Sequence, residues 1–440
     1  MATQLLDRDA GVLALPDVAP ARRRVAFPTH TSRSITGALA FLIGCVTLMM
    51  TGFAVIIPVF PQRLHALGLG SETLALMEAA FGLGMFLFST PMGAWSGRVG
   101  RKPILFLSLA GFIVTNVLLA FVNVPLLFIP IRFVEGMLLS GVFPMAMSMV
   151  GDTIPQEKQG RWIGFLTTAQ AVGFALGPGL GDILAQHFGF TGPFLFSAGI
   201  ALAASLLAIF MVPETLPRRA RVAAGSRRGA HADPETSTHA LKRVRVTSLI
   251  GLIAPFLIID FGMIFTYPFV FPQYPFFLEQ VQHYSAAQYG MLFSTYGMAL
   301  AVFPLVLGRL SETRSKQLLI VTGSLLFGAL NLAMCVAPLY PLLLAGAALA
   351  GLGSAFVEPA MGSLYLSATS DDNRGQIMGI RGSAISLAVM LGPLAQALVG
   401  LWITAQVTFA IGVALSLAMA LVAALLLRRP AQAQPAAVSD

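Results

Sequence analysis

The segment Gly93-Ala-Trp-Ser-Gly-Arg98-Val-Gly100-Arg101-Lys102-Pro103 separates two long apolar stretches. A degenerate copy, Gly308-Arg309-Leu-Ser-Glu312-Thr-Arg314-Ser-Lys316, follows another apolar stretch later in the chain. Glycines permit a tight turn and a close approach of helices, and the cations can bond helix ends and carboxylates. The segment is therefore predicted to be a gating loop between two helices. The simpler alternative is a basic loop that only orients the chain in a membrane.

Ten identical residues recur at a constant offset of 215, which indicates that one unit is written twice. The pairs are Gly82 and Gly297, Gly93 and Gly308, Ser96 and Ser311, Asn116 and Asn331, Gly136 and Gly351, Pro144 and Pro359, Gly160 and Gly375, Gly164 and Gly379, Gly177 and Gly392, and Pro178 and Pro393. The segment Val-Phe-Pro-Gln also occurs twice, from Val59 and from Val270, at an offset of 211. A duplicated set of membrane helices with its ligand site between the repeats is typical of transporters.

The composition places the chain in a bilayer, because 440 residues that are 56% hydrophobic and 10% charged, with a mean hydropathy of +0.81, cannot cover a soluble globule with polar side chains. Twelve stretches approach the length of about 20 residues that a spanning helix needs. They are residues 35–59, 74–95, 103–121, 125–150, 163–186, 193–212, 249–270, 288–307, 318–337, 341–366, 377–401 and 409–427. The expected fold is an all-α integral membrane protein with twelve transmembrane helices in two pseudo-symmetric bundles of six.

The charged residues predict the domain order and the orientation. All but two of the 27 lysines and arginines fall in the tails, the even-numbered loops and their helix ends, the exceptions being Arg63 in an outer loop and Arg132 within a span. Both termini are therefore expected in the cytoplasm. The predicted order is a tail at 1–34, a bundle at 35–212, a basic linker at 213–247, a second bundle at 248–427 and a tail at 428–440. The linker is read as a tether that touches anionic lipid headgroups, with a regulatory role as the alternative.

Several functional classes are excluded by what the sequence lacks. The chain contains no Ser/His/Asp nucleophile set, phosphate-binding loop or clustered metal ligands, so neither an enzyme nor a bound metal or cofactor is expected. Cys45 and Cys335 both fall within spans, which argues against a disulfide. Basic residues spread over the loops without aromatic RNA motifs argue against nucleic-acid binding. The expected partners are the lipid bilayer, a small-molecule substrate and protons.

The fifth span contains a glycine and proline motif, with Gly164 and Gly173 followed by Gly177-Pro178-Gly179-Leu180-Gly181-Asp182. Proline removes a backbone hydrogen bond, and glycines on one face let a neighbouring helix pack against the bend. The motif predicts a compliant hinge, with a purely structural kink as the alternative. Asp182 lies about 28 Å along this helix by helical rise and is expected near the outer rim, so it is a weak candidate for a proton carrier.

Two motifs carry a family resemblance. The loop at Gly93 resembles the signature loop of the major facilitator superfamily, Gly-x-Leu-Ala-Asp-Arg-x-Gly-Arg-Arg/Lys, except that Gly97 stands where the family has Asp. The resemblance implies that Asp152, at the end of the fourth span, is a partner for the loop arginine. The fifth span is similar to the motif of the twelve-span drug:proton antiporters, Gly-x8-Gly-x3-Gly-Pro-x2-Gly-Gly, with Asp182 in place of the last glycine. Two bundles that rock about a central site are implied.

The fourth span carries the main candidate for proton coupling. Its Arg132-Phe-Val-Glu135-Gly136 resembles the family's Arg-x-x-Gln-Gly element. Arg132 and Glu135 are three residues apart and share a helix face, and Glu135 is about 15 Å from the outer end, near the middle of the bilayer. A carboxyl group there is a functional candidate by default. The alternative is a permanent ion pair that only stabilises packing.

The seventh span predicts part of a substrate cavity. Asp260, near mid-bilayer, is followed by several aromatic residues, including Phe265 and Tyr267, and would suit a lipophilic cation. The alternative places these rings toward lipid and bonds Asp260 to a neighbouring helix. Gln170 in the fifth span and Glu358 in the tenth are further cavity candidates.

These features predict a secondary active transporter in the plasma (cytoplasmic or inner) membrane that exports hydrophobic or cationic drug-like compounds in exchange for protons. Two alternatives remain open. One is a facilitator or symporter of a small metabolite, and the other is a membrane sensor that keeps the fold without transport. Glu78, early in the second span, is expected at the membrane interface.

Overall fold

The computed structural model describes residues 32–154, 156–215, 246–368 and 374–427, and all regular elements of these residues are helices. The predicted C-terminal tail, and most of the predicted N-terminal tail and linker, lie outside the described residues. The first half contains α1 (Ser32–Val55), α2 (Val59–Ala66), α3 (Ser71–Val99), α4 (Arg101–Phe121), α5 (Pro125–Leu139), α6 (Val142–Thr153), α7 (Gln156–Phe188) and α8 (Thr191–Met211). The second half contains α10 (Val246–Val270), α11 (Gln273–Phe276), η2 (Phe277–Val281), α12 (Ala286–Thr313), α13 (Lys316–Phe327), α14 (Ala329–Val336), α15 (Tyr340–Ser367), α16 (Arg374–Val399) and α17 (Ala405–Leu426).

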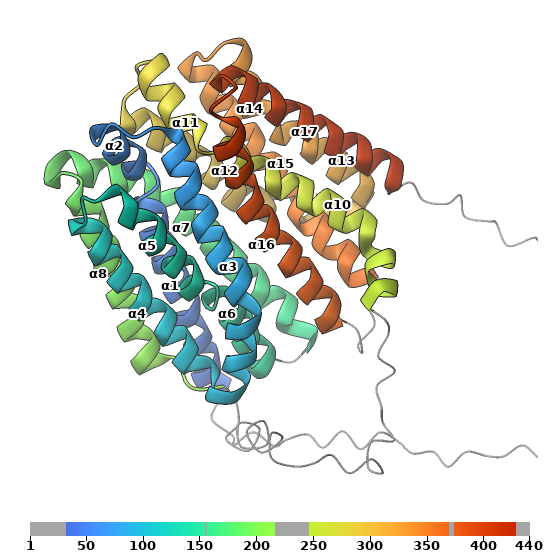
Figure 1. The fold of residues 1–440 in the computed structure, drawn as a ribbon. Helices are drawn as coiled ribbons and strands as arrows, with labels where there is room; N and C mark the ends of the chain where they lie inside the picture. The colour runs from blue at the N-terminus through green and yellow to red at the C-terminus, as the bar shows by residue number, and fades with distance from the viewer. Residues whose placement is uncertain (1–31, 155, 216–245, 369–373, 428–440) are drawn as a thin grey trace, which may run out of the picture.

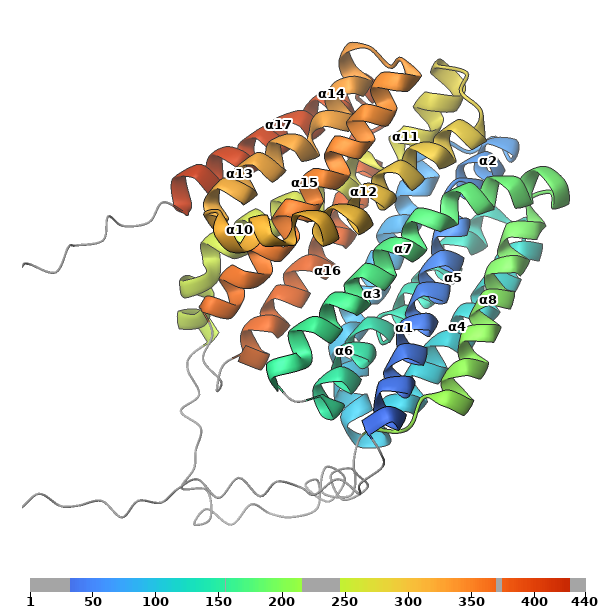
Figure 2. The same ribbon diagram turned by 180° about the vertical axis from the view of Figure 1, so that it is seen from behind.

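Ten helical segments of the described chain are long and apolar enough to cross a membrane. Four of these segments combine shorter consecutive helices, namely α1 with α2, α5 with α6, α10 with α11 and η2, and α13 with α14. Helices α7 and α12, of 33 and 28 residues, lie beside them in the middle of the molecule (Figures 1 and 2). The fold is thus that of a multi-helix membrane protein, as the composition predicts.

The helices of the first half lie on one side of the molecule and those of the second half on the other, and we call these two sets the N-terminal bundle (α1–α8) and the C-terminal bundle (α10–α17) (Figure 1). Within the first, α1 packs on α7 and α8, and α3 packs on α5. Within the second, α10 packs on α16, and α12 and α13 pack on α15. The bundles meet where α3 contacts α16 and where α7 contacts α12. We call the end where α3 passes into α4 the loop end, and the end that carries α2, α11 and η2 the far end (Figure 1).

The glycines of the repeat make equivalent helix contacts in both halves. A Cβ on Gly82 would collide with the backbone of Met390 between the bundles, and one on Gly297 would collide with Ala175, which is the repeat mate of Met390. Gly136 abuts the carbonyl oxygen of Phe81, and its mate Gly351 abuts that of Tyr296, the mate of Phe81. These two duplicated glycine pairs therefore mark positions where neighbouring helices touch, which no larger residue permits.

The duplicated Val-Phe-Pro-Gln segments lie at matching helix breaks. The first follows the turn that divides α1 from α2, and the second spans the turn that divides α10 from α11. The first copy also brings Arg63 into α2, where the side chain is buried and not in an outer loop as the sequence predicts. Its guanidinium donates to the carbonyl oxygen of Val122 at 2.5 Å and to Asn123 Oδ1 at 3.0 Å. Arg63 thus caps the far end of α4.

Candidate functional site

A buried arginine lies between two carboxylates in the N-terminal bundle. Arg132 Nη1 on α5 is 2.8 Å from Glu135 Oε2, and Arg132 Nη2 is 2.6 Å from Glu78 Oε1 on α3. Glu135 and Arg132 are 0% and 2% exposed, while the Glu78 side chain keeps 20% of its surface. With all three groups ionised the cluster carries one net negative charge. We call these three residues, together with Asn116, the Arg132 cluster.

Glycine contacts between α3 and α5 bring this cluster together. A Cβ on Gly136 would collide with the carbonyl oxygen of Phe81, and a Cβ on Gly84 would collide with that of Phe133. Because the two backbones touch at these points, the Glu78 carboxylate on α3 reaches the guanidinium on α5 directly. Glu78, which is expected at the membrane interface from the sequence, is thus an ion-pair partner of Arg132 between α3 and α5.

Aromatic rings and an amide complete the surroundings of the Arg132 cluster. The guanidinium lies 4.5 Å from the ring centre of Phe81 and 5.4 Å from that of Phe60. Asn116 Nδ2 on α4 donates to Glu135 Oε1 at 3.4 Å and to the carbonyl oxygen of Phe112 at 2.9 Å. Such rings stabilise the cation and exclude water, so each charge depends on its partner. The two carboxylates thus share one guanidinium, and one of them can take up a proton while the other keeps the ion pair.

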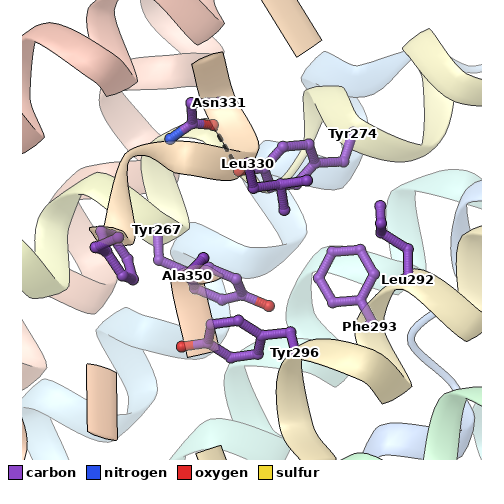
Figure 3. Close-up of a pocket in the computed structure, with 9 residues that line it drawn as sticks. Tyr267, Tyr274, Leu292, Phe293, Tyr296, Leu330, Asn331 and Ala350 are labelled. Carbon is purple, nitrogen blue, oxygen red and sulfur yellow. Dashed lines mark hydrogen bonds between the residues drawn. The ribbon is translucent and has the colours of Figure 1, made fainter. Parts of the chain in front are cut away.

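The equivalent position in the C-terminal bundle holds an aromatic pocket (Figure 3). Figure 3 shows the Tyr274 hydroxyl hydrogen-bonded to the Asn331 side chain, and the donor and acceptor atoms are 2.6 Å apart. Tyr267 and Tyr296 stack with ring centres 6.2 Å apart. The cavity measures about 20 Å³, which is room for about one water molecule. Its lining, which we call the tyrosine pocket, consists of Tyr267, Tyr274, Leu292, Phe293, Tyr296, Phe327, Leu330, Asn331 and Ala350.

A second buried ion pair lies nearer the loop end of the C-terminal bundle. Arg381 Nε on α16 is 2.6 Å from Asp260 Oδ2 on α10, and its guanidinium lies 4.9 Å from the ring centre of Tyr365. Glu358 on α15 lies within electrostatic range of both Asp260 and Arg381 and is exposed. We call Asp260, Glu358 and Arg381 the Arg381 cluster. Asp260 is thus already compensated by a cation, whereas Glu358 has an accessible carboxylate.

The aromatic residues of α10 lie inside the protein. Phe265 is half-buried and stacks on Phe269, and Tyr267 stacks on Tyr296 of α12. Across the bundle interface the ring of Phe174 on α7 meets that of Tyr296 edge-on, with centres 6.5 Å apart. Gln170 is half-buried one helical turn before Phe174. Phe174 of α7 and Tyr296 of α12 therefore meet across the bundle interface, and Tyr296 in turn stacks on Tyr267 of α10.

The glycines of α7 behave as the sequence predicts, with one exception. Gly173, Gly177 and Gly181 would each collide with the backbone of α1 if they carried a Cβ, so α1 and α7 touch along this face. Gly164 has open space where its Cβ would be and makes no such contact. Pro178 lies inside α7. Asp182 is 3% exposed and accepts a hydrogen bond from Gln186 Nε2 at 2.5 Å.

The loop between α3 and α4 is held by carboxylates. Gly100 has φ = +126°, a conformation that glycine adopts without strain. Arg101 pairs through Nε with Asp152 Oδ2 at 3.3 Å, the partner that the family resemblance implies, and through Nη1 with Ser96 Oγ at 2.7 Å. Glu214, which the sequence analysis did not single out, accepts the backbone N–H of Arg101 at 3.0 Å and caps α4.

The remaining loop residues play separate roles. Lys102 Nζ donates to the carbonyl oxygen of Ile209 at the end of α8, at 2.5 Å, and its backbone N–H donates to Glu214. Arg98 is exposed and lines a groove of about 430 Å³ with Trp95, Leu107 and other residues of α3, α4 and α5. A Cβ on Gly93 would meet open space. The loop thus ties α3, α4, α6 and α8 together at the loop end.

Comparison with curated proteins finds relatives among drug-resistance proteins. The chain is 23% identical over 368 residues to "Multidrug resistance protein 2" of Bacillus subtilis (strain 168), covering 80% of this chain and 86% of that protein. It is 24% identical to "Quinolone resistance protein NorA" of Staphylococcus aureus (strain MRSA252), covering 84% and 92%. It is 25% identical to "Tetracycline resistance protein, class E" of Escherichia coli, covering 78% and 83%.

Solved structures share the fold. The human organic anion transporter MFSD10 (TETRAN) aligns with a TM-score of 0.66 at 21% identity and covers 88% of this chain and 99% of its own. The nucleoside transporter NupG aligns with a TM-score of 0.72 at 11% identity and covers 89% and 100%. The family model described as "Major Facilitator Superfamily" matches residues 42–285 and 257–439. Because these matches span most of the sequence, the chain belongs to the Major Facilitator Superfamily.

Proposed function

We propose that this chain is a secondary active transporter that exports hydrophobic, often cationic, drug-like compounds in exchange for protons. The fold consists of twelve membrane helices in two bundles of six, which rock about the contacts of α3 with α16 and of α7 with α12 to expose a central site to each side in turn. The drug-resistance relatives over about four fifths of the chain support this function. Their names describe resistance to several unrelated drugs, which favours a broad substrate range.

The observation that carries the proton coupling is the placement of Arg132 between Glu135 and Glu78 in the interior of a membrane bundle. Three ionised groups leave one negative charge uncompensated, and uptake of one proton makes the cluster neutral. A neutral cluster is less costly in a low-dielectric interior than a charged one. Movement of α3 relative to α5 would change which carboxylate holds the arginine, and so would couple proton binding to the state of the carrier.

We assign the substrate-binding site to the interface between the bundles. Glu358 supplies the accessible carboxylate for a cationic substrate, because Arg381 already compensates Asp260. Tyr267, Phe265 and Gln170 would supply aromatic and amide surfaces for the same substrate. The tyrosine pocket alone is too small for a drug-sized ligand, which needs several hundred Å³. The substrate must therefore occupy the space that opens between the bundles.

In the proposed orientation the protein spans the plasma membrane, and the loop end and both chain termini are in the cytoplasm. The loop and α7 then serve the conformational cycle. Arg101, held by Asp152, stabilises one state of the carrier, and the contact of Gly173, Gly177 and Gly181 with α1 lets the bend at Pro178 change without opening a void.

Transport by reconstituted protein tests the proposal. Proteoliposomes would be loaded with a panel of lipophilic cations, neutral drugs and small metabolites, and accumulation would be measured with and without an imposed pH gradient. Uphill movement of lipophilic cations that requires the gradient is the expected result. Movement of only small metabolites, or of no solute, would contradict it. A cysteine at Ser226 that reacts with an impermeant reagent added outside intact cells would contradict the orientation.

A further inference from the structure

A groove on the outside of the N-terminal bundle takes no part in the proposed transport cycle. It measures about 430 Å³, within the range of about 300–1,000 Å³ that small-molecule sites have. Met137 and Leu138 of α5 form its floor. A Cβ on Gly84 of α3 would collide with the backbone of Met137, and one on Gly111 of α4 would collide with the side chain of Leu138. Helices α3 and α4 therefore both pack on α5 and leave the groove between them.

The walls of the groove are apolar and exposed. Trp95 of α3 and Leu107 of α4 both line it with exposed side chains. Pro91 lines it from inside α3, where proline lacks the backbone N–H of a regular helix and favours a bend. Exposed apolar side chains of membrane helices meet lipid chains, which are as apolar as leucine. The groove thus has the shape and the polarity to hold an acyl chain.

Arg98 is the one charged side chain among the described residues that line the groove. It is exposed, and it has no hydrogen-bond or ion-pair partner in the described part of the chain. The neighbouring cations differ, because Arg101 pairs with Asp152 and Lys102 donates to the carbonyl oxygen of Ile209. A guanidinium can bind phosphate oxygens through two parallel hydrogen bonds. Arg98 can therefore bind an anion at the end of the groove nearest the loop.

Position 97 leaves Arg98 without an acidic neighbour in the sequence. The family motif has Asp there, whereas the segment from Gly93 to Pro103 contains three cations and no acid. A Cβ on Gly97 would meet open space, so an acidic side chain would fit. A carboxylate next to Arg98 would lower the local positive potential and repel an anion. The glycine therefore makes this end of the groove more attractive to anions.

We propose that the groove binds an anionic phospholipid from the leaflet at the loop end. The lipid phosphate accepts hydrogen bonds from the Arg98 guanidinium, and one acyl chain lies between Trp95 and Leu107, over Met137. Tryptophan is common at the depth where headgroups meet acyl chains. In the proposed orientation this leaflet is the cytoplasmic one, whose anionic lipids attract basic segments.

A lipid at this place would join α3, α4 and α5 beside the loop that Arg101 and Asp152 hold. A ligand that binds the folded protein and not the unfolded chain stabilises the folded state. The inference goes beyond the proposed function, because lipid binding requires no transport. Only the choice of the leaflet depends on the proposed orientation, and vesicles with the same lipids in both leaflets remove that dependence.

Tryptophan fluorescence can report what occupies the groove, because Trp95 is one of three tryptophans. Trp162→Phe together with Trp402→Phe leaves Trp95 alone. This protein would be reconstituted in phosphatidylcholine vesicles that contain increasing amounts of brominated phosphatidylglycerol or of brominated phosphatidylcholine. The bromine atoms quench a tryptophan ring that they touch. Half-maximal quenching is expected at an about fivefold lower mole fraction of the anionic lipid, the effect of one cation near an anionic headgroup.

Three variants in this background test the headgroup contact. Arg98→Gln should abolish the preference for phosphatidylglycerol, and Gly97→Asp should reduce it. Arg314→Gln is the matched control, because it removes an exposed cation from the equivalent loop of the C-terminal bundle. This control should keep the fivefold preference.

The thermal unfolding midpoint in detergent gives a second measurement, made with all three tryptophans in place. Added phosphatidylglycerol should raise the midpoint of the wild type and of Arg314→Gln more than phosphatidylcholine does. Arg98→Gln should respond equally to the two lipids. If the protein with Trp95 alone fails to fold, this measurement decides.

Four outcomes would overturn the inference. Equal quenching by the two brominated lipids would mean that the groove meets bulk lipid only. A preference that survives Arg98→Gln, or that Arg314→Gln removes equally, would trace it to the overall charge of the protein. Loss of the preference when glycerol 3-phosphate is added in solution would indicate a site for free phosphates. A protein that accumulates no solute would contradict the proposed function and leave these results unchanged.

Discussion

The same place in the two repeats holds a charged cluster in one half and an aromatic pocket in the other. The offset of 215 carries Glu78, Arg132 and Glu135 onto Phe293, Ala347 and Ala350, and Asn116 onto Asn331. In the N-terminal bundle the asparagine donates to a carboxylate, whereas in the C-terminal bundle it accepts from Tyr274. The scaffold is duplicated, and the ionisable chemistry is not.

This difference separates residues that maintain the fold from residues that we assign to the transport cycle. Glycines that let helix backbones touch recur in both halves, because both bundles need the same crossings. Charged groups in a membrane interior are costly, so a duplicated scaffold has no structural reason to keep them in one half only. The C-terminal bundle carries its own ion pair, Asp260 with Arg381, on different helices and nearer the loop end. Each bundle thus has one cluster of an arginine with two acids, and the two clusters lie at different depths.

The largest effect is expected from removing the arginine of the enclosed cluster. Arg132→Met leaves Glu135 and Glu78 without their cation and should destabilise the protein by about 3–5 kcal/mol, as for other broken buried pairs. Arg381→Met should cost clearly less, because the Arg381 side chain keeps 22% of its surface exposed, against 2% for Arg132. Thermal unfolding in detergent compares the two variants. Equal losses would show that the clusters do not differ in burial energy.

Neutralising one carboxylate of the enclosed cluster should separate coupling from binding. Glu135→Gln removes the negative charge that takes the proton, so uphill export driven by a pH gradient should be abolished while substrate binding and downhill exchange remain measurable. Vesicle accumulation and a binding titration check this pair of outcomes. Full gradient-driven accumulation by the variant would make Glu135 a structural partner of Arg132.

The Arg381 cluster should instead affect how strongly the protein prefers cationic substrates over neutral ones. Glu358→Gln is expected to weaken binding of lipophilic cations by about tenfold, or about 1.4 kcal/mol, and to leave neutral substrates unchanged. Asp260→Asn should act less on affinity, because that carboxylate is engaged by Arg381. Binding titrations with a cation and with a neutral compound of similar size would test this difference in affinity. An equal loss for both compounds would exclude charge recognition.

The smallest effect is expected in the tyrosine pocket. Tyr274→Phe removes the hydrogen bond to Asn331 and should lower stability by about 1 kcal/mol without changing proton coupling. Unfolding and gradient-driven transport would be measured on the same preparation. A loss of coupling here would mean that the two repeat-related positions share one role.

Much of the scaffold could be predicted from the sequence, because apolar length and glycine spacing are local signals. The apolar stretches became helices, the Arg132–Glu135 pair on one helix face is formed, and the repeat pairs Gly82 with Gly297 and Gly136 with Gly351 lie at helix contacts. Apart from Arg101 with Asp152, which the family resemblance implies, the ion pairs between helices could not be predicted. Glu78 is 54 residues from Arg132, and Asp260 is 121 residues from Arg381.

These longer pairings depend on the relative rotation and shift of two helices, which composition does not encode. By its sequence position Arg381 belongs with the basic residues at helix ends. In the structure it lies two turns inside α16 and pairs with Asp260. Gly136, one helical turn after Arg132, was a usable sequence signal for a partner such as Glu78, because a glycine there lets another helix come close. In the structure Gly136 does abut Phe81 of α3.

Proton release on substrate binding tests most directly whether the Arg132 cluster carries the proton. Purified protein in weakly buffered detergent would be mixed with a saturating lipophilic cation, and the released protons would be read with a pH indicator. The account predicts release by the wild type and by Glu358→Gln at saturation, and none by Glu135→Gln. Undiminished proton release by Glu135→Gln would contradict it.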